Sequence, residues 1–208
     1  MSSLPQQSDD IQTPPVSGIL LAGGSSRRMG GTNKALLDLG GKPVIERVAS
    51  TLRRVFPEVV LITNTPELFE FLHLAAHKDL IPGHGSLGGL YTGLRVCSNN
   101  YAFLVACDMP FIQERVLRYM ADLIKDQDVI VPKIQGMWEP LHAIYSRTCL
   151  PHIERLMDAN DLKIMNFFDQ VRIFEVAERD LAVFDPEHRF LINVNTPADL
   201  ERARTMLR

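Results

Sequence analysis

Apolar residues along this chain form two kinds of pattern, which alternate along the sequence. Short unbroken apolar runs, typical of buried strands, occupy residues 17–22, 59–63, 101–107 and 129–132. Between these runs, apolar residues recur at helical spacing over residues 44–55, 87–96 and 116–124, and Pro43 suits the start of the first helix. Strands and helices that alternate in this way predict an α/β fold with a mostly parallel central sheet and helices on both faces.

Length and composition narrow the class of protein further. The 208 residues favour one domain, which we expect over 17–208, after a disordered tail at 1–16 rich in Ser, Gln, Pro and Asp. With 22 Lys plus Arg against 25 Asp plus Glu, the net charge of −3 gives no general electrostatic reason to bind nucleic acid. The absence of a signal peptide and of a long apolar span, together with the 3 cysteines, predicts a cytoplasmic protein that binds no membrane.

A glycine-rich basic loop follows the first predicted strand, over residues 21–34. Glycine lets backbone N–H groups approach an anion closely, and the cations Arg28 and Lys34 can neutralise phosphate oxygens. The loop has no Gly-Lys-Ser/Thr ending and no Gly-x-Gly-x-x-Gly, so it is neither a Walker loop nor a dinucleotide fingerprint. The loop therefore has two interpretations, a phosphate-binding loop or a solvated basic turn.

A second loop places Asp108 directly after the strongest strand candidate, residues 101–107. Mg²⁺ typically takes one or two protein carboxylates together with substrate phosphates and water, so Asp108 is a candidate metal ligand. The alternative is that Asp108 caps a helix beginning near Pro110. Because ligands of α/β sheets bind beyond the carboxyl ends of strands, the two loops together favour a nucleotide–Mg²⁺ site.

Five stretches of the chain resemble the molybdenum cofactor guanylyltransferase family, which has a Rossmann-like nucleotidyltransferase fold. Residues 21–34 resemble its nucleotide-binding signature, and residues 79–90 resemble its second glycine-rich segment. Ala106-Cys107-Asp108-Met109-Pro110 resembles the metal-binding segment, and residues 193–200 resemble the C-terminal signature. Residues 139–143 match more weakly. The first motif is shared with many nucleotidyltransferases, whereas the combination is far more specific.

The resemblance implies that GMP is transferred from GTP to the terminal phosphate of molybdopterin, with Mg²⁺ required and pyrophosphate released. Asp108 would bind the metal, and Lys34 and Arg28 would stabilise charge on the pyrophosphate. The resemblance also implies that the nucleotide is lined by Leu21, Ala22, Gly23 and Gly24, that the guanosine is held by Asn64 and Asp79, and that the molybdopterin side is formed by Asn193 and Asn195. Molybdoenzymes or other cofactor-biosynthesis proteins would take the product, although no segment identifies such a partner.

Several alternatives stay open from the sequence. Within enzymes, the chain could transfer CMP to molybdopterin or a nucleotide to a sugar phosphate. In another class, it could be a GTP-binding carrier of the cofactor, although a carrier needs no Mg²⁺ carboxylate. The family often has Asp where this chain has Asn33, and an amide keeps the hydrogen-bonding shape there. Trp138 has two open roles, plain packing or contact with a pterin.

Overall fold

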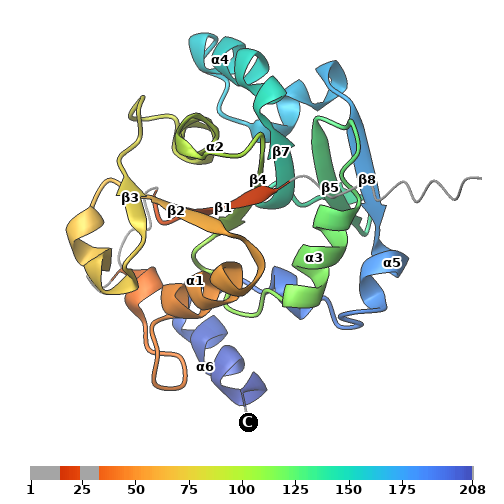
Figure 1. Ribbon diagram of the computed structural model, residues 1–208. Helices are drawn as coiled ribbons and strands as arrows, with labels where there is room; N and C mark the ends of the chain where they lie inside the picture. The colour runs from red at the N-terminus through yellow and green to blue at the C-terminus, as the bar shows by residue number, and fades with distance from the viewer. Residues whose placement is uncertain (1–14, 24–32, 208) are drawn as a thin grey trace, which may run out of the picture.

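The computed structural model describes residues 15–23 and 33–207, and it contains one twisted sheet between two layers of helices (Figure 1). The sheet order is β3-β2-β1-β4-β7-β5-β6, and β8 pairs with β5. The strands are β1 Val16–Leu21, β2 Glu58–Ile62, β3 Ala75–His77, β4 Tyr101–Ala106, β5 Val129–Ile134, β6 Met137–Trp138, β7 His142–Ser146 and β8 Ile173–Ala177. The predicted α/β fold with a mostly parallel sheet is confirmed.

The four apolar runs of the sequence are the centre of this sheet. β1 is buried along its whole length, because it pairs in parallel with β2 on one side and with β4 on the other. β1 begins at Val16, one residue before the expected domain start, and Val16 is buried. Of the rest of the expected tail, Pro15 is exposed and residues 1–14 lie outside the described residues.

A tight hairpin interrupts the parallel arrangement after β5. Gln135 and Gly136 have φ values of 50° and 80°, the positive pair that a two-residue hairpin turn of the I′ type requires. The chain reverses there into β6 and then β7, and β7 inserts antiparallel between β4 and β5. We did not predict this reversal, because the only local signal is one glycine between two apolar segments.

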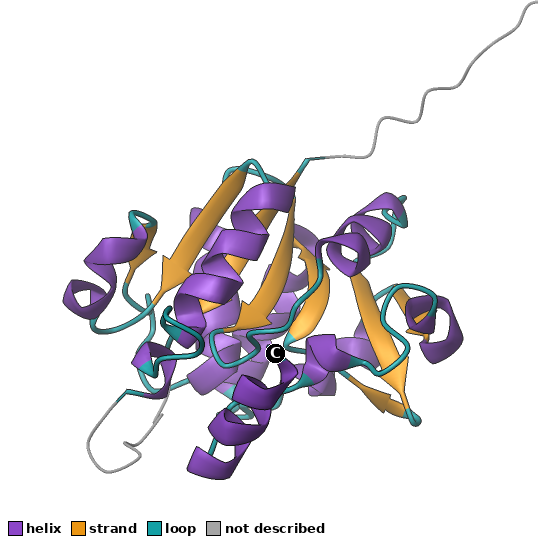
Figure 2. Cartoon of the chain, turned by 90° about the horizontal axis from the view of Figure 1, so that it is seen from below, coloured by secondary structure: helices purple, strands orange, loops and turns teal. Residues whose placement is uncertain are grey.

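Helices cover both faces of the sheet, as predicted. α1 Val44–Val55 and α3 Glu114–Asp122 pack on one face, and α2 Gly85–Val96 and α4 Leu150–Asp158 pack on the other (Figures 1 and 2). The remaining helices are α5 Glu178–Ala182 and α6 Pro197–Met206, with 3-10 turns at Lys34–Leu36, Pro66–Leu72, Arg147–Cys149, Ile164–Gln170 and Arg189–Leu191. Within the described ranges, no helix is long and apolar enough to span a bilayer.

Glycines let α2 lie directly on β1. A Cβ built on Gly93 would come within 2.5 Å of Ile19 Cδ1, and one on Gly89 within 2.8 Å of Leu21 Cδ2. Two glycines of this segment therefore serve packing, because only a helix without side chains at these positions can approach the strand so closely. The close approach also positions the N-terminus of α2 at the carboxyl edge of β1.

Candidate functional site

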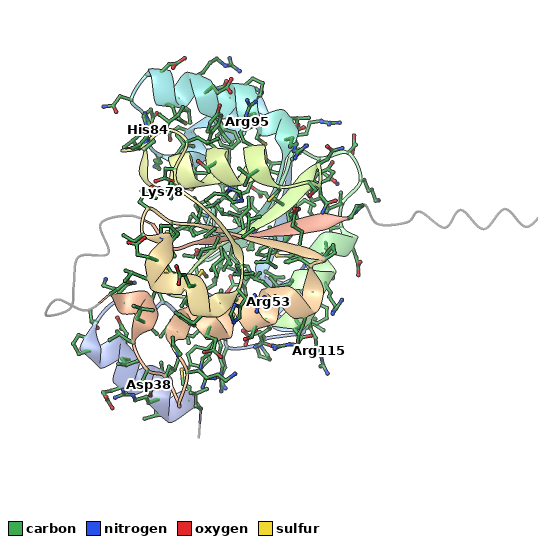
Figure 3. The ribbon with its side chains drawn as sticks, turned by 60° about the vertical axis from the view of Figure 1, so that its left-hand side comes forward. Asp38, Arg53, Lys78, His84, Arg95 and Arg115 are labelled. Carbon is green, nitrogen blue, oxygen red and sulfur yellow. The ribbon has the colours of Figure 1, made fainter. Side chains whose placement is uncertain are left out.

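The candidate site lies at the carboxyl edge of the parallel strands, where the order of connections reverses between β1 and β4. β1 and β4 each continue their pairing one residue beyond their ends. After β1, Ala22 N–H donates to Ile62 O of β2 at 2.9 Å, and after β4, Cys107 N–H donates to Leu21 O of β1 at 2.9 Å. In Figure 3, Lys78 and His84 mark this edge, at the end of β3 and the start of α2. Such a switch point is where open α/β sheets bind ligands.

Asp108 presents an unsatisfied carboxylate at this edge. Its Oδ1 is buried and has no hydrogen-bond partner among the described residues. Burial raises the pKa of Asp108, and its own backbone amide and the Lys34 ammonium oppose that rise. The helix-cap interpretation is wrong, because no helix begins near Pro110 and the next one, α3, begins at Glu114 after Gln113. A buried carboxylate without a partner is costly, so this oxygen is suited to a ligand that brings positive charge.

A cation at Asp108 would need ligands besides the His, Cys, Asp and Glu side chains of the described residues. In the described part of the protein, no group of three His, Cys, Asp or Glu side chains could hold a metal ion. Mg²⁺ fits this donor set, because it commonly takes one carboxylate and completes its octahedron with phosphate and water oxygens. Sites for zinc, which use several protein nitrogens and sulfurs, do not fit.

Lys34 lies near Asp108, and residues from distant parts of the sequence, Asn33 and Asn195, fix its position. It begins a 3-10 turn that the Asn33 side chain caps, because Asn33 Oδ1 accepts from Ala35 N–H at 3.0 Å. The Lys34 ammonium donates to Asn195 Oδ1 at 3.3 Å. An aspartate at position 33 could make the same cap through a carboxylate oxygen, so the departure from the family pattern preserves this contact.

The C-terminal signature, residues 193–200, contacts Asp108 through its backbone and Lys34 through a side chain. Val194 N–H donates to Asp108 O at 2.8 Å. Just beyond, Thr196 and Asp199 form a capping box at the start of α6, and the Asp199 carboxylate also accepts from Asn195 N–H at 3.1 Å. Asn195 is therefore oriented toward Lys34, and both Asn193 and Asn195 are exposed, so their placement near molybdopterin stays a prediction.

Asn64 and Asp79 form a separate pair at the ends of β2 and β3. Asn64 Nδ2 donates to Asp79 Oδ2 at 2.8 Å, and Asp79 N–H donates back to Asn64 Oδ1 at 3.1 Å. The next amide, Leu80 N–H, donates to the buried Thr92 Oγ1 on α2 at 3.0 Å. We did not predict Thr92, which fixes this loop to the helix. The pair leaves the Asp79 carboxylate oriented by its neighbour and able to accept further hydrogen bonds.

Only some of the other predicted residues lie within the part of the chain that the structure describes. Leu21 and Ala22 are buried, and Gly23 is exposed at the strand end. Gly24 and Arg28 lie outside the described residues, so their roles stay predictions. Burial raises the pKa of Cys107 to about 12, so this cysteine is suited to packing and not to acting as a nucleophile.

His142 is a buried residue near the site that we did not predict. It lies opposite Val105 in the β4–β7 register, and its ring packs against Phe103 and Phe190 at 4.9 and 4.8 Å between centroids. Neither ring nitrogen has a partner within the described structure. Burial lowers the pKa of His142 to about 3, so the imidazole is neutral and acts in packing.

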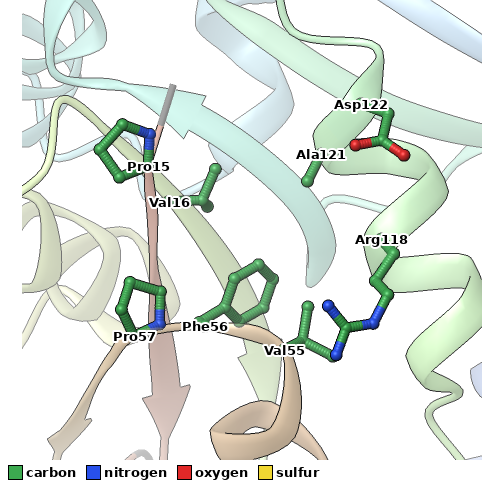
Figure 4. A pocket seen from close by; sticks show the side chains of 8 residues that line it. All are labelled: Pro15, Val16, Val55, Phe56, Pro57, Arg118, Ala121 and Asp122. Carbon is green, nitrogen blue, oxygen red and sulfur yellow. The ribbon is translucent and has the colours of Figure 1, made fainter. Parts of the chain in front are cut away.

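A pocket at the opposite end of β1 is separate from this site. It has a volume of about 390 Å³ and lies between Val55, Phe56 and Arg118, near the start of the strand (Figure 4). The amino ends of parallel strands do not bind ligands in this architecture, and the pocket contains none of the residues predicted for the site.

Comparison with known proteins decides the family. The sequence model of the MobA-like NTP transferase domain matches residues 18–173. The molybdenum cofactor guanylyltransferase of Desulfosudis oleivorans is 38% identical over 194 residues, 93% of this chain and 96% of that protein. This chain belongs to the molybdenum cofactor guanylyltransferase family. As a member of this family it is a nucleotidyltransferase.

Solved structures agree with this assignment. Molybdopterin-guanine dinucleotide biosynthesis protein A from Archaeoglobus fulgidus superposes with a TM-score of 0.80 at 28% identity, over 92% of this chain and 98% of that one. The 4-diphosphocytidyl-2C-methyl-D-erythritol synthase of Anaerococcus prevotii shares the fold alone, with a TM-score of 0.69 at 14% identity, over 94% of this chain and 99% of that one. This chain therefore shares its fold with proteins outside its own family.

Proposed function

We propose that this protein transfers GMP from GTP to the terminal phosphate of molybdopterin, forming the guanine dinucleotide cofactor and pyrophosphate. The observation that carries the proposal is the buried, unpartnered Asp108 carboxylate oxygen at the switch point, with Lys34 beside it. A metal-bound nucleotide would supply the positive charge that this oxygen lacks. Family membership supports the same reaction, and the three free cysteines support a cytoplasmic location.

The proposed metal is Mg²⁺, held by Asp108. When bound, it would neutralise charge on the nucleotide phosphates and on the leaving pyrophosphate. The chain's own contribution is a carboxylate fixed by strand β4 and by the Val194 N–H contact to the Asp108 carbonyl. Because a preformed site needs no rearrangement during the reaction, its electrostatic effect is large.

The chemical step is an in-line displacement at the α-phosphorus of GTP. A bond forms between an acceptor phosphate oxygen and the α-phosphorus, and the bond from that phosphorus to the oxygen bridging to the β-phosphorus breaks. The acceptor oxygen is already anionic at neutral pH, so no general base is needed, and the departing electron pair stays on pyrophosphate. Lys34, oriented by Asn195, would stabilise that developing charge. Arg28 is proposed to assist it.

Asp79 is proposed to select the base. Guanine presents an N–H and an exocyclic amino group side by side, and a carboxylate can accept from both. Asn64 fixes the orientation of that carboxylate through its two hydrogen bonds. Cytosine presents acceptors next to its single amino group, so the same carboxylate would repel it. This match of donors and acceptors supports GTP over CTP as the proposed substrate.

The test is a nucleotide panel with the purified protein and Mg²⁺, measured as pyrophosphate release with and without molybdopterin. We expect release with GTP alone among the four nucleotides, and only when molybdopterin is present. Asp108→Asn measured in parallel separates metal-dependent turnover from background hydrolysis.

Two outcomes would contradict the proposal. Turnover with CTP in place of GTP would overturn the role of Asp79 in base selection. GTP binding without pyrophosphate release in the presence of molybdopterin would instead indicate a carrier of the nucleotide.

A further inference from the structure

A groove of about 570 Å³ lies beside the only tryptophan of the chain. It runs between the 3-10 turn Ile164–Gln170 and the neighbouring strands β6 and β8. Its apolar lining includes the aromatic rings of Trp138 and Phe168 and the flexible side chain of Met165. Its polar groups are the side chains of Asn166 and Asp169. A groove with aromatic walls and few polar groups is typical of a site for a planar, partly polar small molecule.

The indole in this groove is held in place from the sheet. Trp138 Nε1 donates to Glu175 Oε1 at 2.8 Å, and Lys133 Nζ donates to the same carboxylate at 2.9 and 3.0 Å. The Lys133 ammonium also lies 5.4 Å from the indole centroid, and Phe168 meets the indole at 5.3 Å and 63°. Trp138 nevertheless remains partly exposed to the groove. An aromatic side chain fixed before binding loses little entropy when a ligand packs against it.

The polar side of the groove offers a free carboxylate. Asp169 is exposed and makes no hydrogen bond or ion pair with any other residue that the structure describes. Asn166, three residues earlier in the same turn, is oriented by Asp161, whose Oδ2 accepts from Asn166 Nδ2 at 2.6 Å. A carboxylate pairs best with a ligand edge that presents two adjacent N–H donors.

Strand register places the Trp138 end of this groove within reach of the proposed reaction site, whereas Ile173, at the other end, lies beside the start of β5. β6 pairs with the end of β5, and β7, which follows β6, lies beside β4. His142, at the start of β7, is opposite Val105, three residues before Asp108. With strands about 4.8 Å apart and about 3.3 Å per residue, Trp138 lies on the order of 10 Å from Asp108. A ring system in the groove could therefore extend a phosphate-bearing arm toward Asp108.

We propose that this groove binds the 2-amino-4-oxopyrimidine ring of the pterin acceptor, with Trp138 as the aromatic wall and Asp169 accepting from the ring N–H and the 2-amino group. The proposal rests on the proposed function, because it assigns the acceptor half of the same site. It gives Trp138 a binding role in addition to its packing against Phe168. It also separates recognition of the acceptor ring from recognition of guanine, which Asp79 performs on the other side of β1.

The test is calorimetric titration of the full chain, saturated with GTP and Mg²⁺, with free pterin, which has no phosphate and cannot react. Lumazine, which carries oxygen in place of the 2-amino group, is the matched ligand. We expect Asp169→Asn to weaken pterin binding by about 10-fold, the usual effect of losing a hydrogen-bonding charge, and to leave the weak binding of lumazine unchanged. GTP affinity should stay within about twofold.

Two further variants isolate the contributions of charge and of the aromatic wall. Asp158→Asn makes the same charge change at an exposed residue outside the groove and should bind pterin as the parent does. Trp138→Phe should bind pterin more tightly than Trp138→Ala, with melting temperatures reporting whether the second variant folds. In the parent chain, fluorescence of the single tryptophan should fall when pterin is added.

The proposal is overturned if Asp169→Asn binds pterin as tightly as the parent, or if lumazine binds as tightly as pterin. It is also overturned if pterin does not bind while GTP does, and in that case guanylyl transfer would still stand on its own assay. Conversely, pterin binding that depends on Asp169 in a protein that turns over no GTP would support the groove and contradict the proposed function.

Discussion

The Lys34 ammonium donates to Asn195 Oδ1 at 3.3 Å, across 161 positions of the sequence. Lys34 ends the glycine-rich loop, and Asn195 belongs to the C-terminal signature. The contact closes the site around Asp108, since the neighbouring Val194 N–H donates to the Asp108 carbonyl. Activity should therefore depend on the C-terminal segment as well as on the nucleotide-binding loop.

This contact predicts coupling between two substitutions. Lys34→Met should lower kcat by about 10²–10³-fold, because a preorganised charge at the leaving group is lost. Asn195→Ala should lower it less, since it only frees the lysine side chain. In the double variant, the Asn195→Ala effect should largely disappear, because there is no ammonium left to orient. Steady-state kinetics of the four proteins measure the coupling, and strictly additive effects would show that Asn195 acts independently.

Asp108→Asn should lower Mg²⁺-dependent turnover by about 10²–10³-fold without lowering stability. Because burial raises the pKa of Asp108, its ionised form destabilises the fold at neutral pH, and this penalty shrinks as pH falls through the raised pKa. The neutral amide removes the penalty. Urea unfolding without Mg²⁺ should therefore give Asp108→Asn a stability equal to or above that of the parent, with Asp158→Asn as the control for lost charge. A clear loss of stability would mean that Asp108 has a structural role.

Asp79→Asn should change base selection more than stability. The amide keeps the contact with Asn64 but replaces one acceptor with a donor, so it no longer matches the two donors of guanine. We expect kcat/KM for GTP to fall by about 10–100-fold, while CTP, which the parent should not use, stays inactive or becomes a weak substrate. An unchanged kcat/KM for GTP would contradict the role of Asp79 in base selection.

Gly93→Ala should destabilise the protein by about 1–3 kcal/mol, because the new Cβ would overpack the contact between α2 and β1. The clash is with Ile19, whose Cδ1 would lie 2.5 Å away. Adding Ile19→Val removes that methyl group and should recover part of the loss. Ser86→Ala, at an exposed position early in the same helix, is the control for helix composition. Urea midpoints measure all four proteins, and a neutral Gly93→Ala would mean that α2 can shift away from the strand.

His142 should make stability sensitive to mild acid. Burial lowers the pKa of His142 from 6.5 to about 3, so below pH 6.5 the unfolded chain takes up a proton that the folded chain does not. Because of this group, the free energy of unfolding falls by about 1.4 kcal/mol between pH 7.5 and pH 5.5.

His142→Phe should flatten that part of the pH dependence, while His73→Asn, at an exposed left-handed position, should leave it unchanged. Denaturant unfolding at the two pH values measures both. An unchanged slope in His142→Phe would mean that other groups carry the acid sensitivity.

The sequence by itself determined the elements and the chemistry at their ends. Buried strands show as unbroken apolar runs and surface helices as one-sided stripes, because burial on two faces or on one face requires these patterns. The carboxylate at Asp108 and the cation at Lys34 were recognisable because each belongs to a loop that follows an apolar run, and such loops lie at the edge of a sheet. Their combination with the C-terminal signature also indicated the family.

Only the tertiary structure decided which of these residues meet. The antiparallel insertion of β7 depends on a two-residue turn at Gln135 and Gly136, and a local pattern does not specify which strands such a hairpin will pair with. The contact of Lys34 with Asn195, the reciprocal bonds of Asn64 and Asp79, and the groove beside Trp138 join segments far apart in the chain. Local propensity carries no information about such pairs, because their geometry is set by how the helices and strands pack.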